Sequence, residues 1–190
     1  MQLILIRHGR PERVDHDPGG ADPGLTELGH RQAVAMAEYL RPEKIDALYM
    51  SPQQRAIETA APLAEAFGHT ANIVDGIAEF DLGHPSYIPG EETGPLTREE
   101  LDRLTLLLTG TSFQTRVHQS IGKIIADHPG ETVAAVCHGG VISSVLADLL
   151  GVDPMHYFDS HYTSITRIKA SADGRKSLAS FNECHWLREL

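Results

Sequence analysis

Four short apolar runs recur along the chain, and each one stops abruptly at polar or glycine residues. They cover positions 2–6, 45–50, 71–74 and 132–137. A continuous run of large aliphatic residues is typical of a strand buried on both faces of a parallel sheet. Amphipathic helical spacing occupies positions 26–40, 54–67 and 141–150. The alternation predicts an α/β fold, a three-layer α/β/α sandwich with a mostly parallel central sheet.

Local signals mark the ends of some of these elements. Thr26 precedes an acidic turn and predicts the cap of a helix that ends near Leu40. Asp173-Gly174 separates two further strand-like stretches, 164–169 and 178–182. A turn pair between two such stretches predicts a hairpin at the end of the chain.

Positions 76–94 interrupt the alternation with an irregular segment rich in glycine and proline. The segment also carries a dense acidic set: Glu79, Asp81, Glu91 and Glu92. A loop of this length inside a compact domain is usually functional or mobile. Two helices are predicted after it, one from Thr97 and one from Ser112 to near His128. We therefore expect one domain over 1–190, with about 76–128 as a small cap-like insertion.

Composition limits the partners and the compartment. The formal net charge of -10 argues against non-specific binding to nucleic acid or acidic membranes. Two cysteines are too few for a disulfide scaffold and suit a reducing cytosol. The first apolar run is shorter than a signal-peptide core, and no run reaches the length of a membrane span. We expect a cytoplasmic protein without a membrane partner; a homo-oligomer is compatible with the sequence, which indicates no particular assembly.

Residues of matching chemistry follow three of the predicted strands. Arg7-His8-Gly9 follows the first strand, and Ser51-Pro52 with Arg55 one turn later follows the second. His138-Gly139-Gly140 follows the fourth and opens a helix. Because the carboxyl ends of parallel strands share one edge, two arginines and two histidines would converge on one pocket. Arginine donors and glycine amides at a helix start favour a phosphate ligand.

Alternative interpretations of these strand-end residues have less support in the sequence. Taken alone, His138 is a strand-end histidine and Arg55 an ordinary helix arginine. Cys137 beside His138 raises the question of a cysteine nucleophile, but a cysteine inside Val-Ala-Ala-Val is usually a small buried hydrophobe. A zinc site is disfavoured because the arginines would repel the metal. A dehydrogenase is disfavoured because no Gly-x-Gly-x-x-Gly follows the first strand.

Four segments together resemble the histidine phosphatase superfamily, also called the phosphoglycerate mutase-like family. They lie in the order and spacing of that family: 7–9, 25–33, 51–60 and 136–141. The resemblance runs to about Gly151 and is weakest from Gly76 to about His128. It implies that His8 is the nucleophile and becomes a phosphohistidine.

The resemblance also implies the partners of that nucleophile. Arg7, Arg55 and His138 would bind the phosphoryl oxygens and stabilise the transition state, with Gly139 as a further phosphate contact. No metal or organic cofactor is required in this chemistry.

A general acid is expected in the segment after the second arginine, because an alkoxide leaving group needs a proton. Glu79 is the best match to the family and Asp81 the runner-up. One departure from the family follows the first motif, where Arg10-Pro11-Glu12-Arg13-Val14 replaces an asparagine-like phosphate ligand. Arg10 or Arg13 would then contact the phosphate or a second negative group of the substrate.

The sequence thus predicts a phosphatase that hydrolyses small-molecule phosphomonoesters. The nearest alternative is a phosphoglycerate mutase-type transfer, for which the central segment is compact. A third reading is a non-catalytic phosphate-binding module.

Overall fold

The computed structural model describes residues 1–93, 97–99, 106, 111–152 and 158–190. Within these residues the chain forms a sheet of six strands in the order β3-β2-β4-β1-β5-β6. The strands are β1 (Gln2–Arg7), β2 (Ala47–Met50), β3 (Asn72–Ile73), β4 (Thr132–Cys137), β5 (Ile165–Ala170) and β6 (Lys176–Glu183). The helices are α1 (Glu27–Leu40), α2 (Gln54–Phe67), α4 (Thr111–Asp127) and α5 (Gly139–Leu150). Three short 3-10 helices are η1 (Asp75–Ile77), η2 (Gly90–Glu92) and η3 (His185–Glu189).

The sheet is mostly parallel, as predicted. Strands β3, β2, β4 and β1 run parallel to one another. Strand β5 is antiparallel to β1, and β6 is antiparallel to β5, so the predicted terminal hairpin is present. The carboxyl ends of β1, β2 and β4 therefore lie at the same edge of the sheet.

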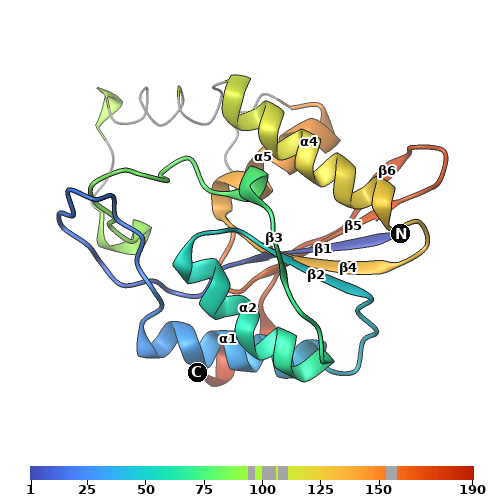
Figure 1. Cartoon of the computed structure of the whole chain (residues 1–190), viewed down its shortest axis with the longest axis horizontal. Helices are drawn as coiled ribbons and strands as arrows, with labels where there is room; N and C mark the ends of the chain where they lie inside the picture. The colour runs from blue at the N-terminus through green and yellow to red at the C-terminus, as the bar shows by residue number, and fades with distance from the viewer. Residues whose placement is uncertain (94–96, 100–105, 107–110, 153–157) are drawn as a thin grey trace.

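Helices cover both faces of the sheet, which confirms the three-layer arrangement (Figure 1). Ile4 and Ile6 of β1 pack in one cluster with α1 and α2, which Trp186 of η3 also joins. Leu3 and Leu5 pack in the opposite cluster with α4 and α5. These four aliphatic side chains of β1 are fully buried, which explains why the strand has a continuous apolar run and not an alternating pattern.

Several boundaries differ from the sequence prediction. Helix α5 begins at Gly139 instead of Val141, because His138 in extended conformation is the N-cap and both glycines take helical backbone angles. Strand β2 begins at Ala47 instead of Ile45. There the Asp46 amide donates to the Thr132 carbonyl at 2.7 Å, but the Thr132 amide bonds to the Asp46 carboxylate at 3.0 Å, and the regular ladder begins at Ala47. The helix expected from Thr97 lies largely outside the described residues. In the described part of the chain, no helix has the length and hydropathy needed to cross a bilayer.

Candidate active site

Three strand ends bring the predicted residues together. The His8 amide donates to the Cys137 carbonyl at 3.0 Å, so the chain just beyond β1 stays beside the end of β4. The His8 and His138 ring centroids are 5.1 Å apart. Ser51, directly after β2, lies 2.7 Å through its Oγ from Nε2 of His138. The expected convergence of strand ends is therefore present.

A cavity of about 430 Å³ opens at this edge of the sheet. Its walls include five of the predicted site residues: Arg7, His8, Arg55, Glu79 and Gly139. Further lining residues come from the irregular segment: Phe80, Asp81, His84, Ser86, Tyr87, Ile88, Gly90 and Thr93. The acidic loop predicted to carry the general acid thus covers the strand ends.

The His8 ring has a defined tautomer. Its Nδ1 lies 2.8 Å from the Gly9 carbonyl oxygen. A carbonyl only accepts, so Nδ1 carries the hydrogen and Nε2 keeps a lone pair. Nε2 makes no hydrogen bond within the described part of the chain. Burial first, then the charges of Arg55 and Arg7, lower the pKa of His8 well below its ordinary value. His8 is therefore a neutral imidazole at neutral pH.

His138 is also held neutral. It is completely buried. Burial and then the Arg55 charge lower its pKa, with smaller contributions from His8 and Arg7. A neutral His138 can donate or accept a hydrogen bond without adding charge to the site.

Both arginines keep unused donors. Arg55 is fully buried on α2, and its Nη2 donates to Asp81 Oδ1 at 2.8 Å and Oδ2 at 2.9 Å. Its Nε and Nη1 have no hydrogen-bond partner among the described residues. Arg7 donates from Nη1 to the Ser160 carbonyl, and its buried Nε likewise has no partner in that part of the chain. Buried, unpaired guanidinium donors suit the oxygens of a phosphoryl group.

The two predicted candidates for the general acid have different surroundings. Glu79 is 7% exposed, and its Oε2 accepts the Gly140 amide at 2.8 Å. A side chain at Gly140 would collide with this carboxyl, so the glycine makes the approach possible. Burial, assisted by the neighbouring Asp81 charge, raises the pKa of Glu79 to about 7. Asp81 instead forms the ion pair with Arg55.

The two remaining candidates, Arg10 and Arg13, lie elsewhere. Arg10 lines a different cavity, where its Nε is 2.9 Å from Glu91 and its Nη2 is 3.1 Å from Glu92. Arg13 forms ion pairs with Asp15 and Glu92. The structure therefore does not bring Arg10 to the cavity wall beside His8.

Comparison with known proteins identifies the family. The family model of the histidine phosphatase superfamily (branch 1) matches residues 3–183. The chain belongs to the histidine phosphatase superfamily.

Individual relatives in this superfamily cover the chain to different extents. A bifunctional protein of Mycobacterium tuberculosis is 32% identical over 98% of this chain, which spans 55% of that relative's length. Phosphoserine phosphatase 1 of Hydrogenobacter thermophilus is 32% identical over 80% of this chain and 78% of its own. The crystal structure of a mutant phosphoserine phosphatase from Entamoeba histolytica with phosphoserine is similar at a TM-score of 0.78, with 27% identity and 98% of both chains covered. The chain thus spans about half the length of the mycobacterial relative it matches.

In this member of the histidine phosphatase superfamily, the sequence analysis missed three residues at the site. Gln53, which is 1% exposed, accepts the Glu79 amide at 2.6 Å and donates to Asp81 at 2.9 Å, so it fixes the acidic loop. Its place just before α2, after the Ser51-Pro52 turn, was the available signal. Tyr87 lies under the Arg55 guanidinium at 4.7 Å, and Tyr162 under that of Arg7 at 4.3 Å. No local pattern marks either tyrosine.

The surroundings of Cys137 and the arrangement of possible metal ligands bear on the two alternative chemistries. Cys137 is completely buried in the core, and burial raises the pKa of its thiol far above the ordinary value, which confirms its interpretation as a small hydrophobe. Among the described residues, no three His, Cys, Asp or Glu side chains form a group that could hold a metal ion.

Proposed function

We propose that this chain hydrolyses small-molecule phosphomonoesters through a phosphohistidine on His8. The observation that carries the proposal is the arrangement in one cavity of a neutral imidazole with a free Nε2 and two arginines with unpaired buried donors. Phosphoryl transfer depends mainly on positioning and charge stabilisation, and these residues supply both. Relatives named as phosphoserine phosphatases support the same reaction class.

In the first step, Arg7 and Arg55 bind the phosphoryl oxygens. Arg55 contributes its unpaired Nε and Nη1, while its Nη2 stays on Asp81. Nε2 of His8 forms a bond to phosphorus while the ester P–O bond breaks. His138, near the His8 ring, donates to the phosphoryl group as its charge develops.

Glu79 is our choice for the general acid. A pKa of about 7 leaves a large fraction of its carboxyl protonated at neutral pH, so it can give a proton to the leaving alkoxide. Asp81 is instead paired with the Arg55 guanidinium, so its oxygens already accept hydrogen bonds. In the second step, water attacks phosphorus, the N–P bond breaks, and the Glu79 carboxylate takes a proton from the water.

We further propose one domain over 1–190, with about 76–128 as the cap that determines substrate choice, and a cytoplasmic location. One sheet that includes strands from both ends of the chain supports the single domain. The part of the cap around residue 100 lies outside the described residues. The two cysteines, both free, favour a reducing compartment.

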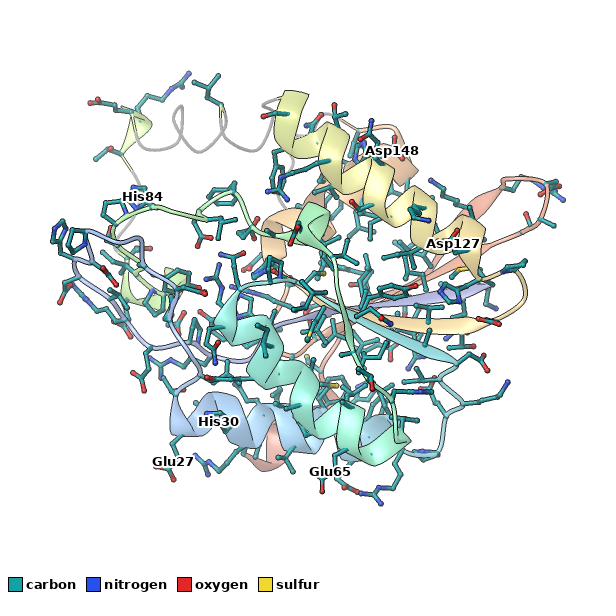
Figure 2. All side chains as sticks on the ribbon, in the orientation of Figure 1. Glu27, His30, Glu65, His84, Asp127 and Asp148 are labelled. Carbon is teal, nitrogen blue, oxygen red and sulfur yellow. The ribbon has the colours of Figure 1, made fainter. Side chains whose placement is uncertain are left out.

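The test is phosphate release from a panel of phosphomonoesters in EDTA, with wild type beside His8→Ala. We expect the substitution to lower turnover by about 10³-fold or more. His30→Ala is the matched control, because His30 lies on α1 with an exposed side chain and should leave turnover unchanged (Figure 2). Acid-labile, alkali-stable phosphate on the wild-type chain alone would identify the phosphohistidine.

Three results would replace the proposal. Release that survives His8→Ala would exclude His8 as the nucleophile. Transfer to a second hydroxyl of the substrate in place of water would favour the mutase. Tight binding of inorganic phosphate without turnover of any ester would favour a binding module.

A further inference from the structure

A second cavity adjoins the first at Arg7. Its volume is about 600 Å³, and Arg7 and Gly90 line both cavities. Arg10, Ser160 and Tyr162 are found only in the second lining. A substrate with its phosphoryl group on Arg7 could therefore extend its alcohol portion toward Arg10.

A carboxylate of the chain itself is held in this second cavity. Glu91 Oε1 lies 2.9 Å from Nε of Arg10, and Glu91 Oε2 accepts the Tyr162 hydroxyl at 2.9 Å. Oε2 thus has a neutral hydrogen-bond donor, whereas Oε1 faces the Arg10 guanidinium in an ion pair in which Nε makes no hydrogen bond. A guanidinium and a hydroxyl placed at the two oxygens of a carboxylate are an arrangement that can recognise this group.

The cavity also offers donors that Glu91 does not use. Ser160 is 1% exposed, and its hydroxyl has no hydrogen-bond partner among the described residues. Buried polar groups are normally paired, so this hydroxyl is available to a polar group of a ligand. Tyr162 also covers the Arg7 guanidinium, and so connects the second cavity to the phosphoryl position.

The contact made by Glu91 is suited to exchange. Its side chain is 44% exposed, and a half-exposed ion pair of this kind stabilises by little. A ligand already bound through its phosphoryl group would present its carboxylate to Arg10 at a high effective concentration. Such a ligand would replace the Glu91 carboxylate with the same two contacts.

We propose that Arg10 and Tyr162 form a carboxylate subsite for the alcohol portion of the substrate, and that Glu91 occupies it until the substrate displaces it. The inference rests on the proposed phosphatase function and narrows its substrates to phosphomonoesters whose alcohol carries a carboxylate. Arg10 is then a specificity-determining residue and not a ligand of the transferred phosphoryl group.

The first test measures binding without turnover. Phosphoserine and phosphoethanolamine share the phosphate and the ammonium group and differ by the carboxylate. On the His8→Ala chain, calorimetry should show phosphoserine binding at least about ten-fold tighter. Adding Arg10→Met should reduce this preference to about two-fold or less, and adding Tyr162→Phe, which keeps the ring on Arg7, should reduce it in part. The matched control is Arg31→Gln, an exposed arginine of α1 outside both linings, which should retain the preference.

The second test removes the internal competitor. Glu91→Gln on the His8→Ala background should tighten phosphoserine about two- to five-fold and leave phosphoethanolamine unchanged. The pair 3-phosphoglycerate and glycerol 3-phosphate repeats the comparison without an ammonium group.

A preference retained in both Arg10→Met and Tyr162→Phe, or equal tightening of both ligands by Glu91→Gln, would overturn the subsite. These measurements need no catalysis, so an inactive wild type would count against the phosphatase alone. Conversely, hydrolysis of phosphoethanolamine that is lost in His8→Ala, without any carboxylate preference, would uphold the phosphatase and reject the subsite.

Discussion

The strand-end group and the loops that cover it are built in different ways. The strand-end group comprises Arg7, His8, Arg55 and His138, and the covering loops are residues 79–93 and 158–163. Backbone ladders hold the first group: the His8 amide bonds to Cys137, and the Ser51 amide to Val136. The second is held by isolated backbone bonds, such as the bridge between Val14 and Tyr87. Side-chain contacts add to these: Gln53 bonds to the 79–81 stretch, and Arg10 and Tyr162 contact Glu91.

Burial follows this division only in part, because Glu79 and Thr163 of the covering loops are nearly as buried as the strand-end group. His138 and Arg55 are completely buried, whereas the side chains of Arg10 and Glu91 are 33% and 44% exposed. A charge held without water acts strongly on its neighbours, and a solvated one acts weakly. The strand-end group and the buried Glu79 should therefore set the rate, while the partly exposed Arg10 and Glu91 adjust substrate choice by smaller factors. Substitutions in the strand-end group and in the residues around it test this difference in effect size.

Arg55→Met should have the largest effect outside His8. Loss of a buried donor set aimed at the transferring group typically lowers the rate by about 10²–10³-fold. Steady-state kinetics on one good substrate measures the effect, beside Arg31→Gln as the surface control. Because the substitution also leaves Asp81 unpaired, the double variant Arg55→Met/Asp81→Asn separates lost phosphate binding from the freed carboxylate. If both variants lost less than about ten-fold in turnover, the strand-end group would not set the rate.

Glu79→Gln should come next, with an effect that depends on the leaving group. An alkyl phosphate needs a proton on its leaving oxygen, so its turnover should fall by about 10²-fold. p-Nitrophenyl phosphate releases a stable phenolate and should lose far less. In wild type, turnover of the alkyl substrate should decline above about pH 7 as Glu79 loses its proton, and this limb should disappear in Glu79→Gln. The same leaving-group dependence in Asp81→Asn, and not in Glu79→Gln, would assign the acid to Asp81.

The free energy of unfolding should depend on pH through the same buried carboxyl of Glu79. The folded state raises the pKa of Glu79 from 4.5 to about 7, so between these values the folded chain binds more protons than the unfolded one. Its contribution is therefore most favourable below about pH 4.5 and is lost as pH rises through about 7. At about pH 8, Glu79→Gln should be more stable than wild type by about 2 kcal/mol, a difference that shrinks toward about pH 5. Urea unfolding at the two pH values measures it, and a gap independent of pH would contradict the raised pKa.

The strand-end group was predictable because each member follows a local pattern. An apolar run predicts the strand, and the residue directly after it lies at the sheet edge wherever the loop goes. Arg7, His8 and His138 follow from this rule alone, and Arg55 from the turn and helix after β2. The convergence of these residues could be predicted without the conformations of the loops between the strands.

The covering loops were not predictable in this way. Tyr162 and Glu91 are 71 positions apart, and no periodicity connects them. Glu79 was ranked above Asp81 through the family resemblance, whereas the contrast between them depends on the close approach to Gly140 and the ion pair with Arg55. Arg10 follows the first motif directly, yet its side chain lines the other cavity because Glu91 and Glu92 pair with it. Such contacts depend on where long loops return, which local patterns do not encode.

The smallest effect is expected at Trp186, through which the C-terminal segment contacts Thr163, a neighbour of His8. Thr163 is completely buried with a φ of 55°, a strained conformation for a β-branched residue. Its amide donates to the His8 carbonyl at 3.2 Å, and its Oγ1 accepts from Trp186 Nε1 at 3.2 Å. Trp186→Phe keeps the aromatic packing and removes that bond, so kcat should fall about two- to five-fold and stability by about 1 kcal/mol. Tyr39→Phe, whose ring packs on Trp186 with centroids 4.5 Å apart, is the control that leaves the bond to Thr163 in place. If Trp186→Phe lowered stability but left kcat unchanged, the strained threonine would be held by the core alone, and the strand-end group would not depend on the C-terminal segment.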